Sequence, residues 1–270
     1  MSSLPHPIIT LLTDFGTKDA YVAAMKGAIL QICPEARVVD ISHAVNKFDI
    51  RHGAFLLAQA SPYFPDGTIH VAVVDPGVGT ERRRIIIQGR RSRYVGPDNG
   101  VLLMAARREG IERAVEITNP RYMLPNPSRT FEGRDIFAPA SAYLAMGTDL
   151  DEFGGEVQDL VQPPFVEARV RRGKVVGEVI HIDGFGNVIT NISELLLRGM
   201  GVAEGTSIGV RLGERVEALR FCGAYGEAPV GVPILVIGSS SLLEVSVNQG
   251  DASVLFKASA GDLIEISTTD

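Results

Sequence analysis

Short apolar runs alternate with longer helical patterns through the first part of the chain. The runs that predict buried strands lie at residues 8–12, 38–41, 69–74, 85–88 and 94–95. Apolar residues at helical spacing predict helices over residues 19–33, 49–61, 101–109 and 138–146. In the first of these helices, Val22, Met25 and Ile29 share one face, Asp19 can cap the start, and Pro34 ends it. This alternation predicts an α/β domain with a mostly parallel sheet.

The pattern changes near Pro163. Helical periodicity then largely disappears, apart from a short segment at residues 193–198. Short β-rich runs replace it at residues 175–182, 207–211, 234–237, 242–247, 253–256 and 263–267. We therefore expect an α/β N-terminal domain over residues 1–165 and a smaller all-β, barrel-like domain over residues 172–270.

Charge and cysteine usage narrow the class of protein. The chain has 270 residues and a net charge of −6, and its arginine-rich stretches at 82–84, 90–93 and 169–172 are short and scattered. A nucleic-acid partner needs a basic face, so we expect none and interpret these stretches as solvated surface or oligomer contacts. No membrane span and no signal peptide are predicted. Cys33 and Cys222 form no CxxC pair and suit reduced thiols, which indicates a cytoplasmic protein.

Two carboxylates stand where an α/β sheet binds its ligands. Asp75 ends the apolar run of residues 69–74 and begins an Asp-Pro-Gly turn. Asp14 follows the run of residues 8–12 and precedes a glycine-containing turn. Open α/β sheets place the ligand crevice at the carboxyl ends of their strands. Arg82 follows Asp75 after a short glycine-containing loop that could fold it back onto that carboxylate.

Several common chemistries have no support in the sequence. There is no GxGxxG dinucleotide fingerprint, no GxxxxGK[ST] phosphate loop and no GxSxG nucleophile elbow. The five histidines lack the spacing of metal ligands, so no metal site is expected. The residue inventory favours chemistry by carboxylates, arginine and backbone groups, without a covalent nucleophile.

Seven segments carry a resemblance to a known family. They are LLTDFGTKDAYVAAMKG, VVDISHAV, VAVVDPGVGTERR, VGPDNGVL, FEGRDIFAPASAYLA, DGFGNVITNI and GSSSLLEVSVNQGDAS. Their order and spacing resemble the S-adenosyl-L-methionine hydroxide adenosyltransferases, relatives of the fluorinases and chlorinases, over nearly the whole chain. The resemblance implies attack of water on C5′ of S-adenosyl-L-methionine, giving adenosine and L-methionine without a cofactor. It also implies homotrimers, with each active site between the N-terminal domain of one subunit and the C-terminal domain of the next.

The resemblance also implies roles for individual residues. Asp14 would bind the two ribose hydroxyls, Phe48 would line the pocket, and Asp75 and Arg82 would belong to an Asp-Arg-His catalytic group. Two segments of the C-terminal domain would hold methionine and adenine. Their matching residues are Asp183, Phe185, Asn187, Ser239, Ser240, Glu244, Val247 and Gln249.

One position departs from the family pattern. The third member of the catalytic group is a histidine in the segment FHGRD, and here Glu132 takes its place. Glu132 would then pair with Arg82, or accept a proton from water as a general base. The departure is also compatible with an altered activity.

Two alternative functions follow from the same residues. The first is a halide-using adenosyl transferase, which Asp75 and Glu132 disfavour because close carboxylates repel a halide at low dielectric. The second is a protein that binds adenosine or S-adenosyl-L-methionine without useful turnover, as a weakened catalytic group would allow.

Overall fold

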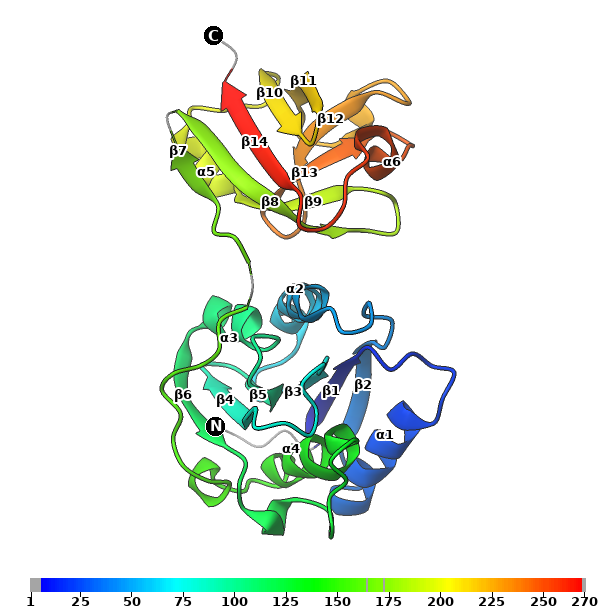
Figure 1. The fold of residues 1–270 in the computed structure, drawn as a ribbon, viewed down its shortest axis with the longest axis vertical. Coiled ribbons are helices and arrows are strands. Elements are labelled where there is room, and N and C mark those ends of the chain that lie inside the picture. The colour runs from blue at the N-terminus through cyan, green and yellow to red at the C-terminus, as the bar shows by residue number, and fades with distance from the viewer. Residues whose placement is uncertain (1–5, 164, 172, 269–270) are drawn as a thin grey trace. The chain divides into compact units, whose positions relative to one another are not determined.

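The computed structural model describes residues 6–163, 165–171 and 173–268. The chain divides into two compact units, Met1–Pro164 and Phe165–Asp270 (Figure 1). The first is an α/β unit and the second is built almost entirely of β-strands.

The N-terminal unit contains one six-stranded sheet with the order β2-β1-β3-β5-β4-β6. Its strands are β1 (Ile8–Thr13), β2 (Arg37–Ser42), β3 (Ile69–Val73), β4 (Arg84–Gly89), β5 (Arg93–Pro97) and β6 (Ile111–Glu116). β2, β1, β3 and β5 run parallel, while β4 is antiparallel to both of its neighbours. The mostly parallel sheet that the sequence predicts is therefore confirmed.

Helices cover both faces of this sheet. They are α1 (Tyr21–Ile32), α2 (Ile50–Ala60), α3 (Leu103–Glu109) and α4 (Ala138–Ala145), with a π-helical turn at Gly133–Phe137 and short 3-10 turns at Ser61–Tyr63, Pro120–Tyr122 and Leu150–Glu152. α1 and α4 lie on one face, and α2 and α3 lie on the other (Figure 1). Side chains of β3 alternate between the two cores, with Val71 and Val73 toward α1 and α4, and Ala72 toward α2 and α3.

The strand order creates a natural binding crevice. β1 pairs with β2 on one side and with β3 on the other, so the chain leaves the ends of β1 and β3 in different directions. Such a switch point opens a crevice at the carboxyl ends of the two strands. Asp14 directly follows β1, and Asp75 lies two residues beyond β3.

The starts of α1 and α2 differ in how they are capped. Asp49 caps α2, because its side chain accepts a hydrogen bond from the backbone N–H of His52 at 3.0 Å. Asp19 does not cap α1: the residue before the helix is Ala20, and no side-chain cap is present there. The prediction for Asp19 was therefore wrong by one position.

The C-terminal unit is a closed barrel with one extra strand. Its strands are β7 (Arg169–Arg171), β8 (Lys174–Ile182), β9 (Val188–Ser193), β10 (Ser207–Leu212), β11 (Arg215–Phe221), β12 (Pro233–Ile237), β13 (Leu242–Val247) and β14 (Leu263–Thr268). The sheet order is β14-β10-β11-β12-β13-β9-β8-β7, and a further pairing of β14 with β8 closes the ring. Two short helices, α5 (Glu194–Gly199) and α6 (Ala252–Phe256), and a 3-10 turn at Tyr225–Glu227 complete the unit. The barrel-like domain is thus confirmed.

One predicted strand of this unit is a helix. The segment 253–256 forms part of α6, where Asp251 accepts a hydrogen bond from the backbone N–H of Val254 at 2.9 Å. Ala252 and Phe256 are both buried, at the spacing of one helical turn. A run this short does not distinguish a buried strand from a buried helical turn by periodicity, and the cap decides the outcome.

His70 lies on β3 and has no exposed surface. Its Nδ1 lies 2.8 Å from the hydroxyl oxygen of Thr10, and its ring stacks on Tyr94 with 5.2 Å between centroids. Burial lowers the pKa of His70 from 6.5 to about 4. Between those two values the unfolded chain binds a proton that the folded chain does not, so stability falls as the pH falls through this window.

We expect His70 alone to reduce the free energy of unfolding by about 2 kcal/mol between pH 7 and pH 5. His70→Gln can keep a hydrogen bond to Thr10 but has no ring to protonate, so this part of the pH dependence should disappear. Denaturant titration of both proteins at the two pH values measures the difference. An equally steep loss of stability in the variant would contradict the assignment.

No helix among the described residues is long and apolar enough to span a bilayer.

Candidate functional site

Asp14 is held in place by a neighbouring loop. Its Oδ2 accepts a hydrogen bond from the backbone N–H of Phe48 at 2.8 Å. The N–H of Gly16 donates to the carbonyl of His43 at 2.8 Å, and the Nδ1 of His43 lies 2.9 Å from the hydroxyl oxygen of Thr13. The loop after β1 and the loop before α2 are therefore joined side by side, with the Asp14 carboxylate between them.

Phe48 combines an exposed ring with a strained backbone. Its φ is +65° and 68% of its surface is exposed. A positive φ is uncommon for a residue with a side chain, and such conformations persist only where neighbouring contacts enforce them. Here the enforcing contacts are the bond to Asp14 on one side and the capped start of α2 on the other.

A cavity of about 370 Å³ brings the N-terminal candidates together. Asp14, Phe48, Asp75 and Glu132 all line it, although they come from four separate segments of the sequence. Arg82 is absent from the lining and lies behind the two catalytic candidates that face the cavity.

One wall of the cavity is aromatic. Phe15, Tyr21 and Phe131 line it, and their rings form a triangle with centroid separations of 5.8, 5.9 and 5.1 Å. Rings in tilted and edge-to-face contact of this kind stabilise one another and hold their positions. The cavity thus offers carboxylates on one side and an apolar surface of ligand size on the other.

Arg82 bridges Asp75 and Glu132. Its Nε donates to Asp75 Oδ1 at 3.0 Å, and its Nη2 donates to both Asp75 Oδ2 and Glu132 Oε2. The three side chains are 10%, 4% and 1% exposed, respectively, so the ion pairs are largely shielded from water. The guanidinium also lies over the ring of Phe137, 5.5 Å from its centroid.

The pKa of Arg82 reflects this environment. Burial alone would lower it, but hydrogen bonding and charge attraction from Asp75, followed by those from Glu132, outweigh burial and raise the pKa of Arg82 above its ordinary value. Arg82 is therefore a fixed cation, and the proton chemistry of the cluster falls to the two carboxylates and to water.

The run Arg82–Arg84 is not solvated surface, and that interpretation of it was wrong. Arg83 pairs with Asp98 and Asp159, each at 2.6 Å, and Arg84 pairs with Glu132. Arg82 and Arg84 both reach the buried Glu132, whereas Arg83 between them points another way, to the buried Asp98 and the exposed Asp159, because successive residues of a strand point to opposite sides.

In the C-terminal unit, Asp183 organises the turn between β8 and β9. Its Oδ1 accepts hydrogen bonds from the backbone N–H groups of Phe185 and Asn187, both at 2.9 Å, and its Oδ2 accepts one from Asn187 Nδ2 at 2.9 Å. Phe185 projects from this turn with 83% of its surface exposed. A large ring that the turn holds in the open is a candidate ligand-stacking surface.

Glu244 lies close to the same turn and is only 6% exposed. Its Oε2 accepts a hydrogen bond from the hydroxyl of Tyr225 at 2.8 Å. Burial raises the pKa of Glu244, the hydrogen bond from Tyr225 lowers it, and the nearby negative charge of Asp183 raises it further, so the net direction is upward. Two neighbouring carboxylates in a partly buried place form an attractive position for a ligand cation such as an ammonium group.

The remaining candidates border Glu244. Ser239 and Ser240 follow Gly238, whose missing side chain makes room for Glu244: an added Cβ would lie 1.7 Å from Glu244 Oε1. Val247 ends β13 with a buried side chain, so only its backbone is available to a ligand. Gln249 follows with φ at +54°, a conformation that turns the chain toward α6.

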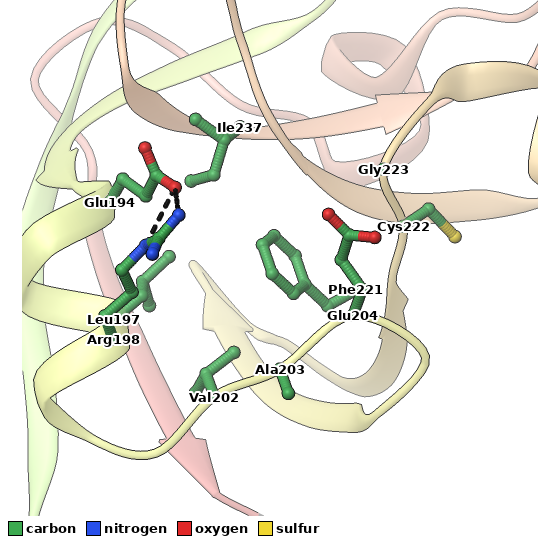
Figure 2. Close-up of a pocket in the computed structure, with 10 residues that line it drawn as sticks. All are labelled: Glu194, Leu197, Arg198, Val202, Ala203, Glu204, Phe221, Cys222, Gly223 and Ile237. Atoms are coloured by element: carbon green, nitrogen blue, oxygen red, sulfur yellow. Dashed lines mark hydrogen bonds and ion pairs between the residues drawn. The ribbon is translucent and has the colours of Figure 1, made fainter.

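A hollow on the described residues of the C-terminal unit contains none of these candidates. It has a volume of about 430 Å³, and Leu197, Val202, Phe221 and Ile237 form its apolar part. Figure 2 shows the Glu194–Arg198 ion pair on one side of it and Glu204 on the other. The sulfur of Cys222 points away from the hollow. This hollow has the features of an ordinary surface depression over the barrel core.

Sequence reasoning missed two parts of the N-terminal site. The aromatic wall could have been predicted, because Phe15 and Phe131 are each the direct sequence neighbour of a predicted site carboxylate. Arg84 could not be distinguished from a solvated arginine by its neighbours in sequence, since its partner Glu132 is 48 residues away.

Comparisons with known proteins agree with this geometry. The family models described as SAM hydroxide adenosyltransferase N-terminal and C-terminal domains match residues 9–154 and 177–265. An (R)-S-adenosyl-L-methionine hydrolase of Salinispora arenicola is 38% identical over 268 residues, which cover 97% of this chain and 98% of that protein. A fluorinase of an Actinoplanes species is 28% identical over 291 residues, covering 97% and 98%. The crystal structure of an uncharacterized conserved protein from Thermotoga maritima superimposes with a TM-score of 0.91 at 38% identity, covering 96% of this chain and 99% of that one.

Proposed function

The chain belongs to the SAM hydroxide adenosyltransferase family, and from that premise we propose that it hydrolyses S-adenosyl-L-methionine to adenosine and L-methionine. One observation carries the proposal. Asp75 and Glu132 both line the cavity that Asp14 also lines, and Arg82, which is not part of the lining, bridges their carboxylates. No cofactor takes part in this reaction.

The two carboxylates suit a water nucleophile. A water in the cavity can donate its hydrogens to Asp75 and Glu132, which leaves a lone pair of its oxygen free to face C5′. Attack forms the C5′–O bond and breaks the C5′–S bond, and the sulfur keeps the electron pair as methionine leaves. The proton released from the attacking water passes to a carboxylate and then to solvent. Because the sulfonium charge disappears, positioning of the water and removal of bulk solvent dominate the rate.

Asp14 fits the ribose end of the substrate. Two vicinal hydroxyls can donate to one carboxylate, and the bond from Phe48 fixes the orientation of that carboxylate. The aromatic wall provides an apolar surface for the rest of the nucleoside. In the C-terminal unit, Asp183, Glu244 and the Ser239–Ser240 turn suit the ammonium and carboxylate of methionine, and the exposed Phe185 ring and Asn187 suit adenine.

A halide-using transferase is the second candidate, and the charge of the cavity disfavours it. A halide at the position of the attacking water would contact Asp75 and Glu132, which line the cavity, whereas the neutralising Arg82 does not. Repulsion between close anions is strong where water is excluded. The third candidate is a protein that binds adenosine or S-adenosyl-L-methionine without turnover, and product analysis distinguishes it from a hydrolase.

Product analysis tests the proposal. Purified protein incubated with the (R) epimer of S-adenosyl-L-methionine should yield adenosine and methionine in equal amounts, at a rate that added chloride or fluoride does not increase. A 5′-halogenated nucleoside would favour the halide-using reaction instead. Nucleoside bound without any product would favour the binding protein.

The functional unit in this proposal is a cytoplasmic homotrimer with composite active sites. Candidate residues lie in both units, and neither unit alone covers the rings of Phe48 and Phe185, which are 68% and 83% exposed. A nucleoside between the N-terminal unit of one subunit and the C-terminal unit of the next would cover both. The two cysteines are buried and free, as suits a reducing compartment.

Light scattering tests the assembly. We expect the mass of three chains at micromolar concentration, with activity confined to that species. A stable monomer that retains full activity would contradict the composite site.

A further inference from the structure

Glu132 is held by two guanidinium groups rather than one. Its Oε2 accepts from Arg82 Nη2, and its Oε1 accepts from Arg84 Nη2. The Glu132 side chain is 1% exposed, so its charge is shielded from water, while the Arg82 and Arg84 side chains are 10% and 30% exposed. Removing one partner of a buried ion pair leaves an uncompensated charge that is costly to keep.

The charges of Asp75, Arg82 and Glu132 balance only when Arg84 is counted with them. Asp75 and Glu132 contribute two negative charges, and Arg82 alone contributes one positive charge. Arg84 supplies the second and makes the four-residue group neutral. Each ionised side chain then has at least one opposite charge within hydrogen-bond distance.

No second charged partner among the described residues explains the position of Arg84. Within the described part of the chain, Glu132 is the one carboxylate with which it pairs, and its Nε is buried without a hydrogen-bond partner. Its neighbour Arg83 by contrast pairs with Asp98 and Asp159 and takes no part in the cavity. The backbone of Arg84 starts β4, but any residue could supply those backbone bonds.

We propose that Arg84 is a positioning residue for hydrolysis, which acts through Glu132 by fixing its second oxygen and balancing its charge. The inference rests on the proposed hydrolysis. Without Arg84, Glu132 can rotate about the single contact to Arg82, and the cavity gains a net negative charge. Without the Glu132 charge, Arg84 becomes a surplus cation beside the cavity, which then attracts anions.

A double-mutant cycle with Arg84→Met and Glu132→Gln tests this coupling. Arg84→Met should lower kcat by about tenfold or more in the parent protein. In a background that already carries Glu132→Gln, the same change should alter kcat by less than about twofold, because its target charge is gone. Arg84→Lys, which keeps the charge, should recover part of the loss.

Arg113→Met is the matched control. Arg113 is 35% exposed and pairs with the exposed Asp151, whereas Arg84 is 30% exposed and pairs with the buried Glu132. The control should keep the parent kcat, and thermal melting should show all variants folded.

Chloride provides a readout that a merely structural role would not move. Glu132→Gln leaves a net positive group, so chloride should inhibit this variant competitively, and adding Arg84→Met should abolish the inhibition. Losses that multiply in the double variant, or an Arg84→Met protein as active as the parent, would overturn the inference while hydrolysis by the parent stands. A parent protein that does not hydrolyse the substrate would instead overturn the proposed function.

Discussion

Asp75→Asn should lower the kcat of hydrolysis by about 10²-fold or more, the usual scale for a positioned acid–base group. The substitution keeps the size of the side chain but removes the negative charge that faces the cavity. It also replaces one of the two carboxylate oxygens that accept hydrogen bonds from the Arg82 guanidinium with an amide NH2 group, which cannot accept one. Steady-state release of adenosine measures the effect, and KM should change much less than kcat.

Asp98→Asn is the control for this experiment. Asp98 is as deeply buried as Asp75, with side-chain exposures of 2% and 4%, and it pairs with the adjacent arginine, Arg83. It does not line the cavity. If both variants lost activity equally, the loss would reflect damage to the sheet edge, and the catalytic role of Asp75 would be refuted.

Asp14→Ala should weaken adenosine binding by roughly 1.5–3 kcal/mol, the range for hydrogen bonds to a charged group. The ribose hydroxyls then lose their shared acceptor. This corresponds to an increase in Kd of about ten- to hundredfold, which calorimetry can measure. The parent protein should also bind 2′-deoxyadenosine more weakly than adenosine, and the variant should not distinguish the two.

The comparison of nucleosides separates ribose recognition from a disturbed loop, because Asp14 also holds the backbone of Phe48. Asp49→Ala serves as a second control, since it removes the cap of α2 in the same loop without removing the proposed ribose contact. It should lower stability by about 1 kcal/mol and keep the preference for adenosine over 2′-deoxyadenosine. A variant at Asp14 that still prefers adenosine over the deoxynucleoside would rule out the assignment.

Local chemistry made much of the N-terminal site predictable. Asp75 stands at a sharp strand exit, and a short glycine-containing loop returns Arg82 to it, so their contact follows from neighbours in sequence. Asp14 follows a buried strand in the same way. The partner of both Arg82 and Arg84 is Glu132, which a long stretch of chain separates from them. Only the packing of the turn before α4 against the sheet brings it there, and no local pattern encodes that packing.

Two of the strands that sequence patterns missed have a common physical cause. β11 (Arg215–Phe221) mixes charged and apolar residues, and it buries only Leu219 and Phe221, which lie on either side of the exposed Arg220. β6 (Ile111–Glu116) likewise begins with exposed residues and buries only Ala114 and Val115. Strands with one solvent-exposed face carry few consecutive apolar residues, so a search for apolar runs overlooks them.

Hydrolysis in oxygen-18 water tests the central claim most directly. The claim is that water held by Asp75 and Glu132 attacks C5′ of S-adenosyl-L-methionine. Mass spectrometry of the products should then find one oxygen-18 atom in the 5′-hydroxyl of adenosine and none in methionine. Adenosine that forms without the label, or label that appears only in methionine, would contradict attack of water at C5′.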